Sequence, residues 1–268
     1  MSARLGEVVA SGTSIWLDDL SRERLIEAPN ATSLAFLIKN EFVSGVTTNP
    51  IIFSQAISKS NLYANEIAVL AAAGSDVESI ITRLTTDDVR SACDLFTDTY
   101  RRSNGIDGRV SIEVDPRLAR DTQTTIAQGI SLWKLVNRPN LLIKVPATVE
   151  GLPAITALIA AGISVNVTII FSVTRYKAVL DAFMDGLEIR LSNGESITEI
   201  HSVASFFISR VDSEVDSQLK VFATPAATAL LGKAAIANAR LAYQEFLRVK
   251  ASQRWKTLKN NGAHIQRP

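Results

Sequence analysis

A lysine interrupts one of the most apolar stretches of the chain. The segment "LLIKVP" opens with three aliphatic residues, as a buried strand does, and then places Lys144 where a fourth would fit. Burial disfavours the charged form of a lysine, and the neutral amine is a nucleophile that can form a Schiff base with a carbonyl substrate. A charged Lys144 at the mouth of the strand, paired with Glu113 or Asp18, fits this stretch equally well. Pro146 indicates that the strand ends soon after the lysine.

Polar residues recur near the ends of other predicted strands. In "SVNVTIIFS", Asn166 and Thr168 have equal parity and share one face, while the alternate residues up to Ile169 share the other. Ser205 in "SVASFFISR" and Glu113 in "RVSIEVD" occupy similarly late positions. Carboxyl ends of parallel strands are where α/β proteins place their ligand sites. We therefore expect these polar side chains and the lysine to belong to one site.

Two further stretches have both a structural and a functional interpretation. In "GVTTNP", Asn49 can cap a helix whose first residue is Pro50, and its amide could also bind a substrate hydroxyl. In "SIWLDDL", Asp18 and Asp19 end a predicted strand, and they could also form the N-cap region of the helix predicted in "SRERLIEA". Neither stretch identifies an activity by itself.

The elements that must position these residues follow a regular alternation. Short β-branched or aliphatic runs alternate with longer segments of helical period, which is typical of βα units and a parallel sheet. An open doubly wound sheet and a (β/α) barrel both fit. The six predicted strands span residues 14–17, 42–46, 109–114, 141–145, 164–170 and 203–208.

The connections between strands are predicted to be helical, and residues 50–107 and 211–262 are predicted to be helical throughout. Helix boundaries are expected where capping residues precede or glycines follow an apolar period. These signals predict helix starts at Ser75 and Thr86, and helix ends at Gly162 and Gly194.

Composition excludes several classes of function. The 28 basic and 27 acidic residues nearly cancel and are mixed along the chain, so no patch argues for nucleic acid. The absence of a leader and of an apolar run long enough for a membrane predicts a cytoplasmic protein without membrane contact. The single cysteine, Cys93, is expected to be buried in a helix. His201 and His264 are far apart and match no metal motif, so neither a metal nor another cofactor is expected.

Six stretches together resemble one family. In order, spacing and residue identity they resemble the corresponding motifs of the transaldolases, in particular those of the actinobacterial-type branch. The resemblance runs from about Ser14 to the last residue and is carried by "SIWLDDL", "GVTTNPIIF", "VSIEVDPRLARDT", "LLIKVPATVEGLPAI", "ISVNVTIIFSVTRY" and "SVASFFISRVDSEVD".

The resemblance implies a TIM-type (β/α) barrel and a Schiff-base enzyme of the pentose phosphate pathway. The implied reaction transfers a dihydroxyacetone unit from sedoheptulose 7-phosphate to glyceraldehyde 3-phosphate, giving erythrose 4-phosphate and fructose 6-phosphate. Sugar phosphates would be its substrates, and the protein could form a homo-oligomer.

The resemblance also implies a role for each candidate residue. Lys144 matches the Schiff-base lysine, and Asp18 matches the acid/base that takes the C4 hydroxyl proton. Glu113 and Thr168 match the pair that positions a water for proton transfer. The remaining matches are substrate-binding: Asn49, Asn166 and Ser205 for the hydroxyls of the dihydroxyacetone unit and Arg210 for phosphate, although a salt bridge from Arg210 to Asp212 or Glu214 would also fit.

The chain also departs from the family pattern. A barrel of this kind has eight strands, whereas we predict six, in a single domain over residues 1–268 that lacks the final strands and leaves the first and sixth strands with open edges. Nothing between Val211 and Pro268 suggests a replacement strand. One alternative is therefore a truncated, inactive or partner-dependent, non-enzymatic remnant. Another is an enzyme like the fructose 6-phosphate aldolases, which use free dihydroxyacetone.

Overall fold

The computed structural model describes residues 2–26 and 31–268. The chain divides into two compact units, Met1–Pro116 with Gln128–Ile143 and Arg117–Ala127 with Lys144–Pro268. The boundary runs through one strand, between Ile143 and Lys144. The prediction of a single domain over residues 1–268 stays a prediction.

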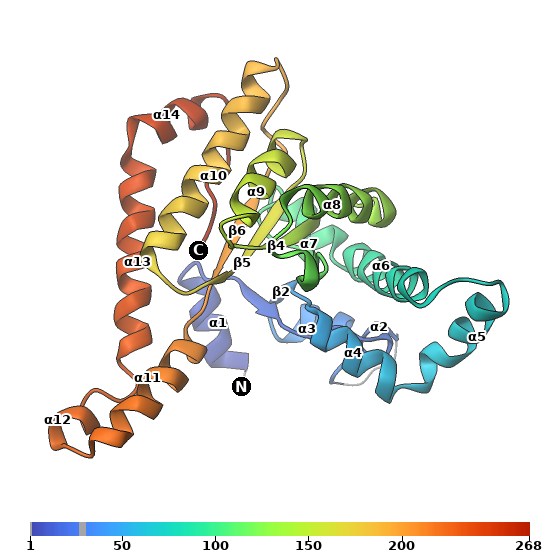
Figure 1. Cartoon of the computed structure of the whole chain (residues 1–268), viewed down its shortest axis with the longest axis horizontal. Helices are drawn as coiled ribbons and strands as arrows, with labels where there is room; N and C mark the ends of the chain where they lie inside the picture. Colours follow the sequence, from blue (N-terminus) through green and yellow to red (C-terminus); the bar gives the residue numbers. More distant parts are fainter. Residues whose placement is uncertain (1, 27–30) are drawn as a thin grey trace. The chain divides into compact units, whose positions relative to one another are not determined.

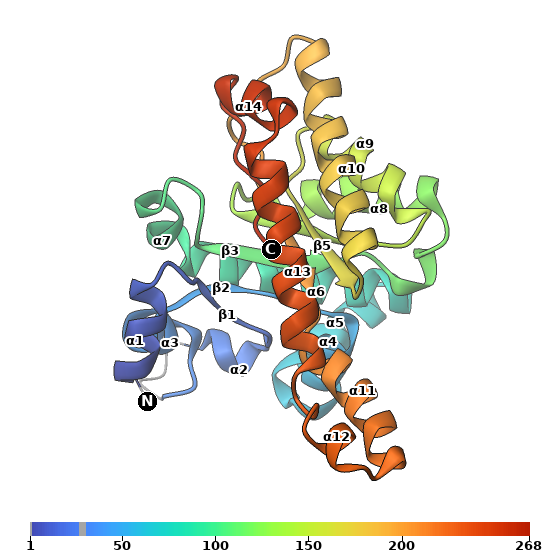
Figure 2. The same ribbon diagram turned by 90° about the vertical axis from the view of Figure 1, so that its left-hand side faces the viewer.

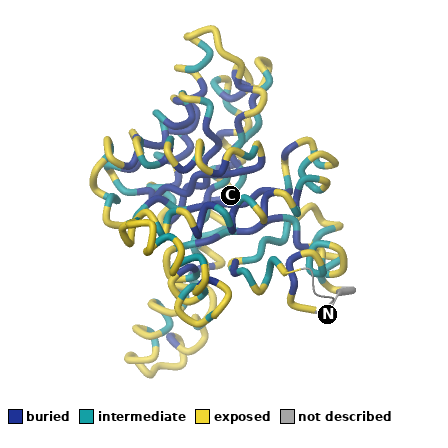
Figure 3. Tube along the Cα trace, turned by 90° about the vertical axis from the view of Figure 1, so that its right-hand side faces the viewer, coloured by how far each residue is buried: buried dark blue, intermediate teal, exposed yellow. Residues whose placement is uncertain are grey.

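Within the described residues, six parallel strands form a sheet in which the strand order follows the chain order (Figure 1). This order, with helices between successive strands, confirms the predicted fold class, an incomplete TIM-type (β/α) barrel with six of eight strands. The six strands differ in burial: the middle ones are mostly buried, whereas the first is half-buried at every position (Figure 3). They are β1 (Ile15–Leu17), β2 (Val43–Val46), β3 (Arg109–Glu113), β4 (Leu141–Pro146), β5 (Val165–Ile170) and β6 (Ser202–Phe206).

Each predicted strand is confirmed to within two residues at either end. The largest difference is at the end of β6, which stops at Phe206, so that Phe207 and Ile208 lie outside the strand. Phe42 does not begin β2, because its φ of 60° is in the left-handed region and is incompatible with an extended strand.

The first unit carries several helices, of which those from residue 50 onward fall in a stretch predicted to be helical throughout. Turns separate these helices, so the prediction that residues 50–107 are helical throughout is wrong in detail. The helices are α1 (Ser2–Ala10), α2 (Arg22–Leu25), α3 (Leu34–Asn40), α4 (Pro50–Lys59), η1 (Asn61–Tyr63), α5 (Ala64–Ala72), α6 (Val77–Leu95) and α7 (Thr97–Arg102).

Two predicted helix starts in this unit are wrong. Asp76, not Ser75, caps α6, because its carboxylate accepts the Ser79 N–H at 2.7 Å. Thr86 lies inside α6, where its hydroxyl donates to the Thr82 carbonyl one turn earlier and therefore does not cap a helix start.

Cys93 is fully buried in α6, as predicted. Burial is the main cause that raises the pKa of its thiol, and the neighbouring Asp94 carboxylate adds to the effect. The thiol behaves as a small apolar group.

A buried asparagine joins α6 to the sheet of the first unit. The Asn140 side-chain amide donates to the Cys93 carbonyl at 2.9 Å and to the Gly108 carbonyl at 2.8 Å. Its backbone carbonyl accepts the Val110 N–H at 3.1 Å. One side chain therefore satisfies two buried carbonyls that precede β3 and end α6.

The second unit has longer helices. α10 lies beside both α9 and α13 (Figures 1 and 2). Gly162 and Gly194, both with positive φ, follow the ends of α9 and α10 and confirm the predicted stops. The predicted helical stretch over residues 211–262 is divided in the same way as the first. The helices are α9 (Gly151–Ala160), α10 (Val173–Ser192), α11 (Ser209–Phe222), α12 (Pro225–Thr228), α13 (Ala234–Ala251) and α14 (Gln253–Asn260), besides η2 (Pro116–Leu118) and α8 (Thr122–Val136) at the unit boundary.

The regular alternation predicted for β5 fails at its end. Ile169 has a φ of 60° and a side chain that is 48% exposed, and the pairing of β5 with β6 shifts between Val167 and Ile170. The extra residue turns Ile170 into the core, where it is fully buried. Alternation therefore holds through Thr168 and not beyond.

The predicted open edge of β6 is also wrong over part of its length. The Arg267 N–H donates to the Ser202 carbonyl at 3.1 Å, and the Arg267 carbonyl accepts the Ala204 N–H at 2.7 Å. Val203 and Arg267 thus form a parallel bridge. Gln266 is fully buried and donates to the Ser202 hydroxyl at 2.8 Å. Residues near Pro268 therefore supply the pairing that no sequence signal suggested.

We expect Asn140→Ala to lower the free energy of unfolding by about 2–4 kcal/mol, because each unsatisfied buried carbonyl costs about 1–3 kcal/mol. Asn140→Asp should cost at least as much, since a carboxylate cannot donate to either carbonyl. Urea unfolding monitored by circular dichroism measures the change. The control is Asn40→Ala, which removes an exposed side-chain bond to the Phe36 carbonyl; equal losses at both positions would contradict the assignment.

We expect Gly186→Ala to destabilise the protein by about 1–3 kcal/mol through overpacking, although alanine is the better helix former. A Cβ at Gly186 would lie 2.6 Å from the Ile159 Cβ and 2.7 Å from the Thr156 carbonyl oxygen, where α9 and α10 meet. Gly6→Ala is the matched control, since its nearest neighbour would be 3.4 Å away. A stabilised Gly186→Ala variant in urea unfolding would refute the close contact.

Candidate active site

Lys144 lies near the carboxyl end of a strand that is buried at every position. It is two residues before Pro146, where β4 ends, and only 6% of its surface is exposed. Burial of an ionisable side chain in a sheet is costly unless polar groups surround it. The predicted location near the end of a buried strand is confirmed.

Two strands of the same unit supply polar side chains. Asn166 and Thr168 on β5 are 1% and 2% exposed. The Ser205 hydroxyl on β6 donates to the Asn166 Oδ1 at 2.9 Å, which places Ser205 on the same face of the sheet. The amide oxygen of Asn166 thus accepts a hydrogen bond within a polar pair on this face.

Lys144 lies at the level of this pair. The Ala147 N–H donates to the Thr168 carbonyl at 2.8 Å and fixes the register of β4 against β5. In a parallel ladder this bond aligns Ala147 with the residue after Thr168, so three residues earlier Lys144 aligns with Asn166. Lys144, Asn166 and Ser205 therefore follow one another across three strands.

Arg210 lies beyond the end of β6, in a helix. It is exposed in the first turn of α11, and its guanidinium lies 5.0 Å from the centroid of the Phe207 ring. Phe207 stacks on Phe171, with centroids 5.1 Å apart, and its N–H donates to the Ile170 carbonyl. Asp212, the alternative ion-pair partner, accepts the Ala235 N–H at 2.9 Å.

The two phenylalanines are the residues that sequence reasoning missed. They follow β5 and β6 directly and form an aromatic support for Arg210. The signal was available in "IIFS" and "SFFIS", where an aromatic residue follows a buried strand.

The first unit contains three further candidates. Asp18 follows β1 and is exposed, and it lines a cavity of about 580 Å³ together with Asp19 and Arg24. Asp19 forms an ion pair with Arg24, and Ser21 caps α2 by accepting the Arg24 N–H. The structural alternative for Asp18 and Asp19 thus does not hold, because Ser21 and not an aspartate caps α2.

Asn49 has the predicted capping role. Its Oδ1 accepts the Ile52 N–H at 3.0 Å at the start of α4, and Pro50 is the first helical residue. The cap uses only the oxygen, so the NH₂ group of the same half-buried side chain can donate to a ligand. Capping and substrate binding are therefore compatible.

Glu113 is the last residue of β3 and is half-buried. The segment that follows β2 is bound to β3 through the buried Thr48, whose hydroxyl donates to the Ser111 carbonyl at 2.7 Å. Thr48 precedes Asn49, and Ser111 precedes Glu113 by two residues. This bond thus sets the relative positions of two predicted site residues.

The two histidines are far apart in sequence but adjacent in space. The His201 and His264 rings stack with centroids 4.2 Å apart. Within residues 2–26 and 31–268, no three histidine, cysteine or acidic side chains gather as a metal-binding group. No helix in these ranges is long and apolar enough to cross a bilayer.

Comparison with known proteins identifies the family. Residues 15–264 match the family described as Transaldolase/Fructose-6-phosphate aldolase. The chain is 56% identical over 264 residues to a transaldolase of Mycolicibacterium smegmatis, covering 98% of this chain and 70% of that protein. It is 55% identical to a transaldolase of Mycolicibacterium paratuberculosis and 54% identical to one of Mycobacterium tuberculosis, each over 265 residues and with the same coverage. The chain belongs to the transaldolase/fructose-6-phosphate aldolase family, and its function is that of a transaldolase, a transferase.

Proposed function

We propose that Lys144 is the Schiff-base lysine of a dihydroxyacetone transfer between sugar phosphates. The observation that carries this proposal is a buried lysine on β4 aligned with the hydrogen-bonded pair of Asn166 and Ser205. An amine among hydrogen-bonding groups suits a ketose, whose carbonyl carbon reacts while its neighbouring hydroxyls are held.

The proposed donor half-reaction begins at the ketone. The Lys144 amine attacks C2 of sedoheptulose 7-phosphate, and the carbinolamine loses water to give an iminium ion. Glu113 and Thr168 position the water that carries protons in this step. Asn49, Asn166 and Ser205 hold the hydroxyls of the three-carbon unit.

Carbon–carbon cleavage follows from the charge on the iminium nitrogen. Asp18 takes the proton of the C4 hydroxyl, the C3–C4 bond breaks, and its electron pair moves into the iminium to give an enamine. Erythrose 4-phosphate leaves. The enamine then attacks C1 of glyceraldehyde 3-phosphate, the new hydroxyl takes the proton back from Asp18, and hydrolysis releases fructose 6-phosphate.

Arg210 is proposed to bind the phosphate of the sugar. Its guanidinium is exposed and oriented by Phe207, and a planar fork of donors fits a phosphate in bidentate fashion. Because the Phe207 ring already orients the Arg210 guanidinium, the arginine side chain loses less conformational entropy when it binds a phosphate.

We expect borohydride added with fructose 6-phosphate to attach a dihydroxyacetone-derived group to Lys144, seen as a mass increase on the peptide that contains it. Lys144→Ala should show no adduct and no transfer. Lys144→Arg keeps a positive charge but cannot form an imine, so it should be equally inactive. An adduct on another residue in the folded wild-type protein would refute the assignment.

The same preparation separates a transaldolase from an aldolase of the same family. A transaldolase should release little free dihydroxyacetone from fructose 6-phosphate alone and turn over rapidly once erythrose 4-phosphate is added. Rapid release of dihydroxyacetone without an acceptor would favour the aldolase alternative.

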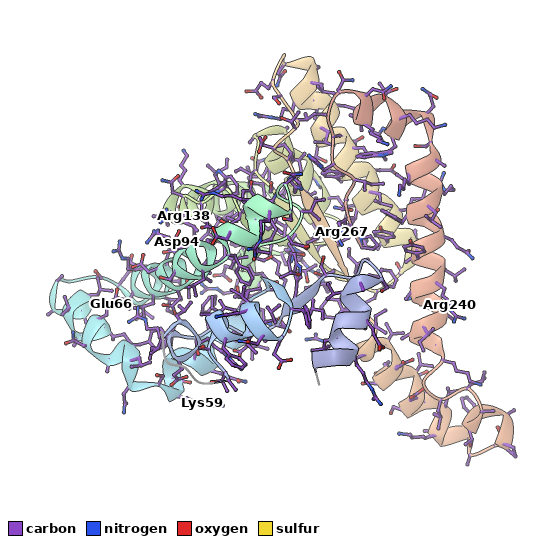
Figure 4. The ribbon with its side chains drawn as sticks, turned by 180° about the vertical axis from the view of Figure 1, so that it is seen from behind. Lys59, Glu66, Asp94, Arg138, Arg240 and Arg267 are labelled. Carbon is purple, nitrogen blue, oxygen red and sulfur yellow. The ribbon has the colours of Figure 1, made fainter. Side chains whose placement is uncertain are left out.

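We expect Arg210→Ala to raise KM for fructose 6-phosphate about 10- to 100-fold, because a hydrogen bond to a charged group contributes about 1.5–3 kcal/mol. The weak reaction with unphosphorylated fructose should change little. Arg240→Ala, which removes an exposed arginine from α13, is the matched control (Figure 4). Equal effects on both ketoses would show that Arg210 does not bind phosphate.

A further inference from the structure

The loop between β1 and α2 has to hold Asp18 in a defined direction. Asp18 is exposed, so packing of its own side chain does not fix it. At one end of the loop, the Leu17 carbonyl accepts the Thr47 N–H at 2.9 Å. At the other end, Leu20 is fully buried and Ser21 caps α2. The position of α2 therefore decides where the second half of the loop runs.

α2 cannot hold its own position. It has four residues, Arg22–Leu25, and none of them is buried. A single helical turn is unstable in isolation, because nucleation fixes several dihedrals for one hydrogen bond. Its position must come from contacts with other elements, and α6 is one of them.

Three side chains provide those contacts, which we name the Tyr63 cluster: Arg22, Tyr63 and Asp88. The Tyr63 hydroxyl accepts the Arg22 backbone N–H at 3.0 Å and donates to the Asp88 Oδ2 at 2.7 Å. The Arg22 Nε donates to the Asp88 Oδ1 at 3.1 Å, and the guanidinium lies 4.4 Å from the Tyr63 ring centroid. The first residue of α2 is thus bound through both its backbone and its side chain.

The Tyr63 cluster is buried where it meets α6. Tyr63 is fully buried and Asp88 is 3% exposed. At the rim, Arg22 also pairs with Glu66 at 2.5 Å and donates to the Leu62 carbonyl at 3.1 Å. Since buried polar groups are costly when unpaired, loss of one member leaves the others unsatisfied and frees α2.

The protonation states of the cluster agree with this geometry. Burial is the main cause that raises the pKa of Tyr63, and the hydrogen bond to Asp88 raises it further, so the phenol keeps its proton at neutral pH. Burial also raises the pKa of Asp88, and the bonds from Tyr63 and Arg22 offset part of that rise.

We propose that Arg22, Tyr63 and Asp88 are positioning residues that hold Asp18 for carbon–carbon cleavage. This inference rests on the proposed function, in which Asp18 accepts the C4 hydroxyl proton. The cluster acts through α2 and the loop that precedes it, and its members need not touch the substrate. Imine formation at Lys144 does not use Asp18, so the two steps can be separated by experiment.

Tyr63→Phe removes only the hydroxyl that joins the Arg22 backbone to Asp88. We expect kcat for transfer to fall between about tenfold and a hundredfold, since small misplacements of a catalytic group have effects of this size. The borohydride adduct on Lys144 should change in mass, from the dihydroxyacetone unit to the intact hexose phosphate, because cleavage is slowed after the imine has formed. Asp88→Asn should give the same shift.

Two further variants complete the design. Glu66→Gln weakens the cluster only at its exposed rim, so it keeps the test possible if Tyr63→Phe does not fold, and we expect a smaller shift in the same direction. The matched control is Asp94→Asn, which lies on α6 like Asp88 and breaks the bidentate pair of Asp94 with Arg138 (Figure 4). We expect its adduct to match the wild type.

The outcomes are distinct. An adduct composition like that of the wild type in both Tyr63→Phe and Asp88→Asn would overturn the inference, even if kcat fell. An equal change in Asp94→Asn would overturn it as well, because the effect would then be general destabilisation. A wild-type protein that forms no Lys144 adduct would refute the proposed function itself.

Discussion

The whole arrangement depends on the difficulty of burying an amine in a parallel sheet. β4 is buried at every position, and a lysine there is tolerated only where hydrogen-bonding groups line the same face. β5 and β6 meet that need with Asn166 and Ser205, which are already bonded to each other. A buried amine with a polar pair beside it costs core stability, and such costs are commonly found at functional sites.

Local sequence predicted most of the sheet because strand signals are local. Apolar runs, parity and terminating residues located six strands to within two residues, and "TNP" located the start of α4. Prediction failed where distant contacts decide. The shift at Ile169 depends on pairing with β6. The pairing of Arg267 with Ser202 joins two residues that the helices α11 to α14 separate in the sequence. The helix start at Thr86 failed because the threonine bonds back within α6.

The candidate site was predicted by residue type, and its supports were not. Resemblance could assign Asp18 a role, but no pattern in the chain joins Arg22, Tyr63 and Asp88, which lie in three different helical segments. Arg210 was expected just beyond the sixth strand, but β6 ends two residues earlier than predicted and Arg210 lies in the first turn of α11. Its real location in α11 makes Phe207 its neighbour. Family resemblance can thus suggest a role for a residue, but it does not predict the contacts that position that residue.

Asn49 has a consequence for how this chain can vary. One end of its amide completes a helix terminus while the other remains available to a ligand. Aspartate or serine would preserve the first use and abolish the second, whereas alanine would abolish both. Helix capping therefore admits a few residue types at position 49, whereas capping together with a side-chain amide donor would admit only asparagine.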